Sequence, residues 1–388
     1  MKENRRDFIR KTGVSLAAVS VGGIGAAIAA PNAVPAAKVN VSGNALQELA
    51  NASKIRIGIQ APAEATAQQI SFYKQAGVNH INLWGTGLKA DAEYLKARKR
   101  DFANTGLDIY GTNDFALINN DKIILNLPGR DEQIEMYKQH LRALGAAGIG
   151  YTTYAHSGNG VWSSDNGVAR ADAVARAFSP NGKIWGQWGD KKYTGPLSHG
   201  RQYTTVEMWA NFEHFIKAVA PVAEENNVKI GILPDDPMVA KLAGVPRVFT
   251  SFEGYQHALT LTRSPNVGVA LSVGTWAQAG SKAGKDVFGM IDYYGKHKKL
   301  FEVRTSNIDQ PNNFTTTFVD GGYIDMYKVM KALKNVNFDG IVIADHMPEM
   351  IKSGGGRGGV NPANDPSLAW TIGYTKCLRD RVEEEAVI

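Results

Sequence analysis

The feature that most constrains the fold is a short apolar segment that recurs eight times along the chain and alternates with longer segments of helical periodicity. These segments, rich in β-branched and aliphatic residues, span residues 54–59, 79–83, 107–111, 149–154, 228–233, 267–272, 299–304 and 340–345. Because most of their positions are apolar, they are typical of parallel strands buried on both faces. Eight such strands with helices between them predict an α/β fold, the (β/α)8 barrel, with a doubly wound open sheet as the alternative.

The segments between these strands place apolar residues at helical spacing. The clearest examples are residues 133–144, 208–223 and 326–333. Thr250 and Glu253 have the spacing of a capping box, so we expect a helix that begins there and includes His257 and Leu261.

The N-terminal residues have the order of a bacterial export signal. The pair Arg5 and Arg6 precedes an apolar segment of small residues from 14 to 30, and an Ala- and Pro-rich stretch follows. This order predicts a twin-arginine signal at residues 1–37, export to the periplasm by the twin-arginine machinery, and a single barrel domain at residues 38–388. A permanent anchor is the alternative, but the apolar segment is short and rich in Gly and Ala, so we expect no stable membrane insertion.

Charge and cysteine content exclude several classes of function. Without the five basic and two acidic residues of positions 1–37, the net charge falls from +6 to +3, which does not indicate nucleic acid or an anionic membrane as a partner. Cys377 is the single cysteine, so an internal disulfide, a zinc ribbon and a CxxC redox site are excluded.

Two connections are candidates for a role beyond simple turns. Residues 156–201 follow the fourth strand and contain four large aromatic residues, Trp162, Trp185, Trp188 and Tyr193. Over the mouth of a barrel these side chains suit the apolar faces of a sugar, and a small outer core is an equal alternative. The glycine-rich loop 353–359, with Arg357, suits an anion, although a plain flexible loop is the better interpretation.

In a barrel of this kind the chemistry collects at the carboxyl ends of the strands. The residues at those positions form a polar ring of mixed charge: Gln60, Trp84, Asn113, His156, Asp235, Asp236, Ser272, Glu302, Arg304, Asp345 and His346. Glu302 and Asp345 are hard oxygen donors on adjacent strands, so they are candidate ligands for Mn2+, Mg2+ or a related ion.

Arg304 and His346 are the candidates for substrate binding and proton transfer. Arg304 points along the same strand as Glu302 and can bind a carboxylate through two hydrogen bonds, and His346 can move a proton near neutral pH. The alternative is structural, since a carboxylate and an arginine at neighbouring strand ends can simply pair with each other. Asp235 and Asp236 can likewise serve only to cap the segment that follows them.

Several motifs, in the same order and at similar spacing, resemble those of the mannonate dehydratase family. They are residues 211–225, the Pro-Asp-Asp-Pro sequence at 234–237, residues 244–247, Gly274 with Thr275, Val303 with Arg304, residues 325–327, and Asp345 with His346. The resemblance extends over residues 211–346 and is weaker elsewhere, and it is the combination of motifs that is specific.

The resemblance implies a xylose-isomerase-like barrel and a hydro-lyase of hexuronate catabolism, which removes water from D-mannonate or a related sugar acid to give a 2-keto-3-deoxy acid. It also implies a divalent metal, Mn2+ or Fe2+, that stabilises charge on the substrate carboxylate as the C2 proton leaves. We therefore expect three sets of site residues. They are His346, Arg304 and Asp235 for catalysis; Arg304, His156, Asn113 and Trp84 for substrate binding; and Asp345, Glu302 and Ser272 for the metal.

The chain departs from the family pattern at the expected metal ligands. The pattern has a His before Pro-Asp-Asp-Pro, a Cys at the end of strand six and a His two residues before the arginine of strand seven. Here these positions are Leu233, Ser272 and Glu302, and Asp345 alone is unchanged. Two alternatives to the dehydratase stay open: another periplasmic sugar isomerase, epimerase or lyase of the same superfamily, and a sugar-binding barrel without catalysis.

Overall fold

The computed structural model describes residues 53–85, 88–350 and 365–385. The predicted export signal at residues 1–37 and the glycine-rich loop with Arg357 lie outside these residues. Within the described ranges, no helix combines the length and the apolar character that a membrane span requires.

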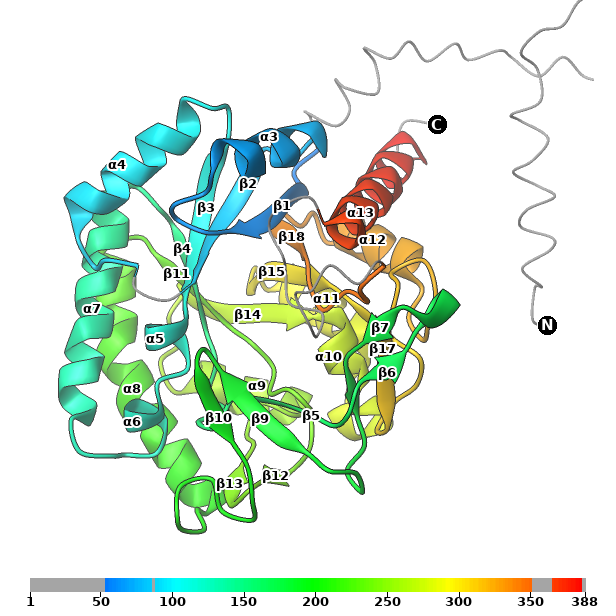
Figure 1. The fold of residues 1–388 in the computed structure, drawn as a ribbon. Helices are drawn as coiled ribbons and strands as arrows, with labels where there is room; N and C mark the ends of the chain where they lie inside the picture. Colours follow the sequence, from blue (N-terminus) through cyan, green and yellow to red (C-terminus); the bar gives the residue numbers. More distant parts are fainter. Residues whose placement is uncertain (1–52, 86–87, 351–364, 386–388) are drawn as a thin grey trace, which may run out of the picture. The chain divides into compact units, whose positions relative to one another are not determined.

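In this part of the chain, eight parallel strands close into a barrel, as the eight apolar segments predict (Figure 1). In their order around the barrel the strands are β1 (Arg56–Ala61), β2 (His80–Gly85), β3 (Asp108–Asp114), β4 (Tyr151–Tyr154), β11 (Lys229–Ile232), β14 (Val267–Ser272), β15 (Leu300–Thr305) and β18 (Ile341–Ala344). The last strand pairs with the first, where Ile57 lies opposite Val342. This closure excludes the open sheet that the sequence left as an alternative.

The barrel interior explains why the strand segments are so continuously apolar. Every residue of β14 and β15 is buried, because side chains point alternately into the barrel and onto the surrounding helices. Tyr151 fills part of the interior beside Gly111 and Gly231. A Cβ atom at Gly111 would lie 2.6 Å from Tyr151 Cδ1, and one at Gly231 would lie 2.4 Å from the tyrosine hydroxyl oxygen, so both positions require glycine.

Helices alternate with the strands and surround the barrel (Figure 1). The longer helices are α3 (Ala67–Gln75), α4 (Ala92–Ala103), α7 (Arg130–Ala146), α8 (Thr205–Glu225), α9 (Phe252–Thr260), α11 (Val287–Lys296), α12 (Met326–Asn335) and α13 (Pro366–Glu385). Shorter helical turns are α5 (Phe115–Ile118), α6 (Asp121–Ile124), α10 (Val273–Ala277), η1 (Arg170–Asp172) and η2 (Gly280–Ala283). The three clearest amphipathic segments fall inside α7, α8 and α12, which confirms those predictions.

The predicted start of α9 is wrong by one residue. The hydroxyl of Ser251, and not that of Thr250, accepts the capping hydrogen bond, from the backbone N–H of Gly254 at 3.2 Å. With Ser251 as the N-cap, the third helical position is Gly254, which has no side chain to complete a capping box. A genuine capping box opens α8 instead, where Thr204 and Glu207 bond reciprocally.

The long connection after β4 folds into small antiparallel sheets, joined by residues from later loops. The strands of these sheets are β5 (Val161–Ser163), β9 (Trp185–Trp188) and β10 (Lys191–Tyr193); β6 (Gly167–Val168) and β7 (Val174–Ala175); and β8 (Ala177–Phe178), β17 (Phe314–Thr317) and β16 (Asn307–Ile308). A separate pair, β12 (Lys241–Leu242) and β13 (Val245–Pro246), follows β11. Trp162 and Tyr193 are buried within the connection, as a small outer core predicts, while Trp188 lines a cavity.

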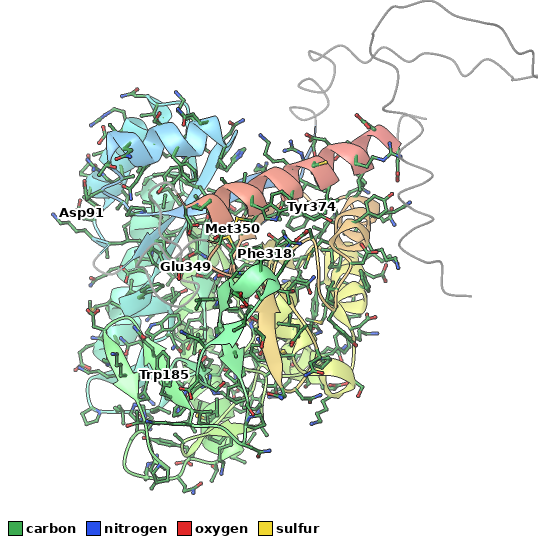
Figure 2. All side chains as sticks on the ribbon, turned by 45° about the vertical axis from the view of Figure 1, so that its right-hand side comes forward. Asp91, Trp185, Phe318, Glu349, Met350 and Tyr374 are labelled. Atoms are coloured by element: carbon green, nitrogen blue, oxygen red, sulfur yellow. The ribbon has the colours of Figure 1, made fainter. Side chains whose placement is uncertain are left out.

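Segments far apart in the sequence fix this connection in place. β8 pairs with β17, so that Phe178 lies opposite Phe314, and their rings stack with centroids 6.1 Å apart. The backbone N–H of Glu349, beyond β18, donates to the carbonyl oxygen of Val174 at 2.8 Å. Figure 2 shows Glu349 and Phe318 beside this part of the connection. The connection is therefore held by the loops after β15 and β18.

Candidate functional site

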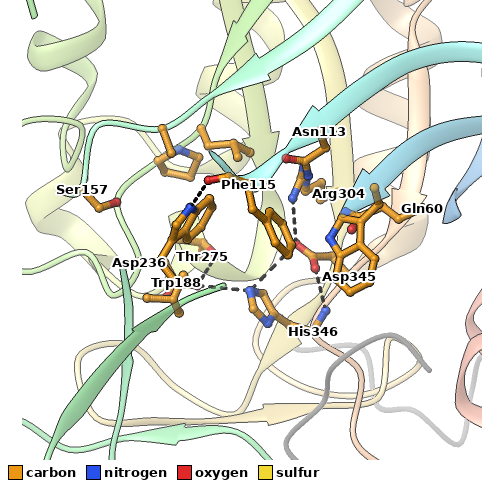
Figure 3. A pocket seen from close by; sticks show the side chains of 15 residues that line it. Gln60, Asn113, Phe115, Ser157, Trp188, Asp236, Thr275, Arg304, Asp345 and His346 are labelled. Atoms are coloured by element: carbon orange, nitrogen blue, oxygen red, sulfur yellow. Dashed lines mark hydrogen bonds and ion pairs between the residues drawn. The ribbon is translucent and has the colours of Figure 1, made fainter. Parts of the chain in front are cut away.

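The carboxyl ends of the barrel strands border a cavity of about 200 Å³ (Figure 3). Its lining residues are Gln60, Trp84, Asn113, Phe115, Ala155, Ser157, Val161, Trp188, Leu233, Pro234, Asp236, Thr275, Arg304, Asp345 and His346. The cavity thus collects seven residues of the predicted ring: Gln60, Trp84, Asn113, Asp236, Arg304, Asp345 and His346. This grouping follows from the barrel itself, because parallel strands bring their carboxyl ends to the same side.

One wall of the cavity is aromatic. The ring of Phe115 meets Trp84 edge-to-face at 5.1 Å and Trp188 at 5.2 Å between centroids. The indole N–H of Trp188 donates to the carbonyl oxygen of Phe115 at 2.7 Å, which fixes the connection against the end of β3. Phe115 was missed by sequence reasoning, because its position one residue beyond β3 looks like that of any helix-starting apolar residue.

Arg304 lies between two carboxylates. Its Nε donates to Glu302 Oε1 at 2.5 Å, and its Nη1 is 3.7 Å from Asp345 Oδ2. The other oxygen of Glu302 accepts from Asn82 Nδ2 at 2.7 Å. Burial would lower the pKa of Arg304, but the negative charges of Glu302 and Asp345 outweigh burial and raise this pKa above its ordinary value. The guanidinium is therefore a permanent cation that two carboxylates share.

His346 lies between two further carboxylate contacts. Its Nε2 is 3.2 Å from Asp236 Oδ2 and 3.9 Å from Asp345 Oδ2. Burial would lower the pKa of His346, but the charges of Asp345 and Asp236 outweigh burial, so the pKa lies above the ordinary value of 6.5. His346 also has a φ of 43°, a left-handed conformation that favours glycine and that a non-glycine residue adopts only at a cost in free energy.

Asp236 is held by three side chains from two parts of the chain, the long connection and α10 with its C-cap residue. Arg176 Nη2, from the long connection, donates to its Oδ1 at 2.7 Å, and Gln278 Nε2 donates to the same oxygen at 3.2 Å. The hydroxyl of Thr275 donates to Oδ2 at 3.3 Å. Burial would raise the pKa of Asp236, but Arg176 and His346 hold it well below its usual range. Asp236 therefore stays an anion that orients His346.

Of these partners, Arg176 and Gln278 carry no sequence signal that points to the site. Arg176 lies between two-residue strands in the connection, 60 positions before Asp236. Thr275 belongs to the Gly274–Thr275 motif, which is a detectable signal for that residue alone.

Two residues predicted at the site, His156 and Asp235, lie outside the cavity lining. His156 Nδ1 bonds to the hydroxyl of Tyr154 at 2.8 Å, and its Nε2 bonds to the carbonyl oxygen of Met208 at 3.1 Å. Burial lowers the pKa of His156 to about 3. Asp235 accepts from Arg247 Nη1 at 3.3 Å and from the backbone N–H of Phe249, and burial raises its pKa. Both side chains have structural partners, so the structure gives neither a position from which to touch a substrate.

Ser272 and Glu302, predicted as metal ligands, are also absent from the lining. Both are buried, and the Ser272 hydroxyl donates to Thr275 Oγ1 at 3.0 Å. Leu233, which does line the cavity, offers an apolar side chain at a position where the family pattern has a ligand. In the described ranges, no three His, Cys, Asp or Glu side chains are placed to hold a metal ion together. The residues present therefore do not fit the metal that the resemblance implies.

Three buried polar atoms of lining residues have no hydrogen-bond partner among the described residues. They are Nη2 of Arg304, Nε2 of Gln60 and Oδ1 of Asn113. Leaving such groups unpaired is costly in a protein interior, so each is a position where a ligand atom would be stabilised. Two donors and one acceptor suit a ligand that carries both a carboxylate and hydroxyl groups.

Comparison with known proteins agrees with this fold. The family model described as D-mannonate dehydratase (UxuA) matches residues 191–383. Over these residues the chain is similar to the D-mannonate dehydratase family. The match contains the motifs by which the sequence resembles this family, and it confirms that prediction.

Individual relatives extend the likeness. A mannonate dehydratase of Streptococcus pneumoniae (strain 70585) is 31% identical over 241 residues, covering 56% of this chain and 64% of that protein. One of Oceanobacillus iheyensis is 29% identical over 254 residues, covering 58% and 69%. The chain therefore spans a little under two thirds of the length of the first of these relatives.

Solved structures confirm the barrel. The mannonate dehydratase from Streptococcus suis serotype 2 superposes with a TM-score of 0.73 at 24% identity, covering 86% of this chain and 96% of that one. An L-ribulose 3-epimerase superposes with a TM-score of 0.53 at 13% identity, covering 86% and 97%. At these identities the likeness concerns the fold, a (β/α)8 barrel of the xylose-isomerase-like kind.

Proposed function

We propose that the chain is a hydro-lyase that removes water from D-mannonate or a closely related sugar acid to give a 2-keto-3-deoxy acid. The observation that carries this proposal is the order of three side chains in the cavity. Asp345 lies 3.7 Å from Arg304 and 3.9 Å from His346, so cation, carboxylate and imidazole follow one another (Figure 3). This order matches C1, C2 and C3 of a sugar acid, whose carboxylate, acidic C–H and departing hydroxyl lie on successive carbons.

Arg304 binds the substrate carboxylate at C1. Its Nη2 is buried and has no hydrogen-bond partner among the described residues. The same holds for the donor Nε2 of Gln60, another lining residue. A guanidinium bound to the carboxylate also stabilises the negative charge that moves onto these oxygens when the C2 proton leaves.

Asp345 and His346 move the protons. Asp345 takes the proton from C2, the C2–H electrons form the C2–C3 double bond, and the C3–O bond breaks as the imidazolium of His346 donates its proton to the departing oxygen. The products are water and an enol, which tautomerises to the 2-keto acid. The proton on Asp345 then returns to His346, which is 3.9 Å away, and the site is restored. The raised pKa of His346 favours the acid form that this step needs.

The direct test is to incubate the purified chain with D-mannonate and measure the 2-keto-3-deoxy acid that forms, beside D-gluconate and other C6 aldonates. We expect turnover that falls by about 100-fold or more in Asp345→Asn, because the base is lost. Asp131→Asn is a matched control, since Asp131 is exposed on α7 and pairs only with surface residues. Absence of product from every aldonate would refute the proposal.

We also propose that residues 1–37 direct export, so that the chain works in the periplasm. The support is the order of the twin arginines, the apolar segment and the Ala- and Pro-rich stretch. Replacing Arg5 and Arg6 with lysine is expected to leave the protein in the cytoplasm, as measured by cell fractionation. Equal amounts of both proteins in the periplasm would contradict the signal.

A further inference from the structure

We propose that the guanidinium of Arg304 takes the electrostatic place of a divalent metal in this cavity, so that the site binds no stoichiometric metal at the family position. The claim about metal binding rests on the geometry alone. The claim that catalysis proceeds without metal rests in addition on the proposed function.

Glu302 is the first reason. It is fully buried, and both of its oxygens are engaged, one by Arg304 at 2.5 Å and the other by Asn82 at 2.7 Å. A buried carboxylate needs a compensating positive charge, and here the guanidinium of Arg304 provides it in place of a bound ion. A dication bound to Glu302 would displace these hydrogen bonds and would lie beside a guanidinium that repels it.

Asp345 is the second reason. It is the remaining carboxylate at the expected metal position, and the same guanidinium lies 3.7 Å from it. Arg304 lies between the two carboxylates and thus compensates the negative charge of both. Any dication that used Asp345 would again have to approach this fixed positive charge, which repels it strongly where water is scarce.

The other expected ligand positions are the third reason. Leu233 lines the cavity but has no donor atom, and the neutral hydroxyl of Ser272 is occupied with Thr275. A ligand set of this kind offers at most one free carboxylate, whereas bound transition metals need several N, O or S donors in a defined geometry.

Arg304 still has capacity to act on a substrate. With Nε used by Glu302 and Nη1 near Asp345, its buried Nη2 has no partner among the described residues, and Arg304 itself lines the cavity. Glu302 therefore has a positioning role, since it fixes the plane of the guanidinium and so directs Nη2. The planar cation then serves for the charge of the substrate carboxylate, the task that a metal performs in metal-assisted dehydration.

The first experiment measures the manganese, iron and magnesium content of the full chain by elemental mass spectrometry. The protein is purified without an affinity metal, then dialysed against excess Mn2+ and freed of unbound metal. We expect no stoichiometric metal before or after dialysis. About one ion per chain in the wild-type protein, lost in Asp345→Asn, would overturn the proposal.

The second experiment removes the guanidinium. Arg304→Met leaves Glu302 and Asp345 without their shared cation, so we expect this variant to gain affinity for Mn2+ and its melting temperature to rise by about 5 °C at saturating Mn2+. The wild-type protein and the matched control Arg142→Met, a half-exposed arginine on α7, should show no such shift. A folded Arg304→Met protein that is indifferent to Mn2+ would overturn the claim that the guanidinium excludes the metal.

A third variant keeps the proposal testable if Arg304→Met does not fold. Arg304→Gln keeps a hydrogen-bond donor beside Glu302 but removes the positive charge, so we expect this protein also to gain affinity for Mn2+. A folded Arg304→Gln protein that is indifferent to Mn2+ would overturn the claim that the guanidinium excludes the metal. Metal content also separates the two proposals. A metal-free protein that acts on no aldonate refutes the proposed function and leaves the claim about metal binding intact. Turnover that is abolished by a chelator and restored by Mn2+ supports the proposed function and overturns the present inference.

Discussion

His156 and His346 each lie two residues beyond a barrel strand, β4 and β18, and the structure gives them opposite environments. His156 packs edge-on against Phe212 at 5.3 Å and uses both ring nitrogens for bonds to protein groups. His346 lines the cavity and has carboxylates at 3.2 and 3.9 Å. The pKa of the first falls to about 3 through burial, and the pKa of the second rises because its two carboxylates outweigh burial.

A position at the end of a barrel strand is therefore not sufficient to give a histidine a place in the cavity. After β4 the chain turns beneath α8, whose Met208 carbonyl and Phe212 ring enclose the imidazole. After β18 the chain reaches the cavity, and the nearest groups are acidic. The same residue type therefore has a structural role in one case and, in the proposed mechanism, donates a proton in the other.

Of the substitutions that distinguish the roles of the two histidines, replacement of His346 should have the largest effect on catalysis. We expect His346→Asn to lower kcat by about 10²- to 10⁴-fold, because the acid for the departing hydroxyl is lost. The melting temperature should change little, since the residue is at the cavity surface. Initial rates of 2-keto acid formation and thermal unfolding measure the two effects, and His214→Asn, on the outer face of α8, is the matched control. Unchanged kcat would remove His346 from the mechanism.

Replacement of His156 should have the opposite profile. We expect His156→Ala to lower the free energy of unfolding by about 3 kcal/mol, because the variant leaves a cavity and unpaired partners for two hydrogen bonds. The kcat/KM of the folded protein should stay within about 2-fold of wild type, since no interaction with the transition state is removed. Denaturant unfolding and steady-state kinetics check both values. A large loss of kcat with unchanged stability would return His156 to the substrate site.

Acid should destabilise the protein through its buried neutral histidines. Burial lowers the pKa of His156 to about 3 and that of His140 to about 4, so below 6.5 the unfolded chain binds protons that the folded chain does not. Each group then lowers the free energy of unfolding by up to about 1.4 kcal/mol per pH unit as the pH falls toward 5. The raised pKa of His346 works in the other direction, since its contribution is complete below 6.5 and is lost as the pH rises.

Denaturant unfolding of wild type and His156→Ala between pH 7 and 5 isolates this effect. The free energy of unfolding of the variant should fall less steeply with decreasing pH than that of wild type. The difference between the two slopes is the contribution of His156. Equal slopes in the two proteins would show that His156 takes up a proton in the folded state, against its burial.

The aromatic wall should produce the smallest effect. Trp188→Phe keeps a ring beside Phe115 but removes the indole donor to the Phe115 carbonyl oxygen. We expect KM for the sugar acid to rise about 5-fold, equivalent to about 1 kcal/mol, with kcat unchanged. Steady-state kinetics on D-mannonate measure this, and a change in kcat with constant KM would place Trp188 at the reacting atoms instead.

The sequence by itself determined the architecture and part of the site. Eight apolar segments that alternate with helical segments predict a parallel α/β fold and favour the barrel, because strand burial and helix periodicity are local properties of the chain. The sequence also predicted that Arg304, Asp345 and His346 lie close together, because parallel strands place their carboxyl ends on one side of the barrel. Several of the family motifs directly follow barrel strands, such as residues 234–237 after β11 and Asp345 with His346 after β18.

Only the tertiary structure decided which of the strand-end residues face the cavity and what charge they carry. His156 lies outside the cavity because it packs against α8, and Asp235 lies outside it because it pairs with Arg247. Asp236 is fixed by Arg176, which belongs to a connection without a recognisable sequence pattern. These outcomes depend on burial and on the distances between charges from segments far apart in sequence. Neither quantity exists until the chain has folded, and both determine the pKa values and ion pairs on which the chemistry depends.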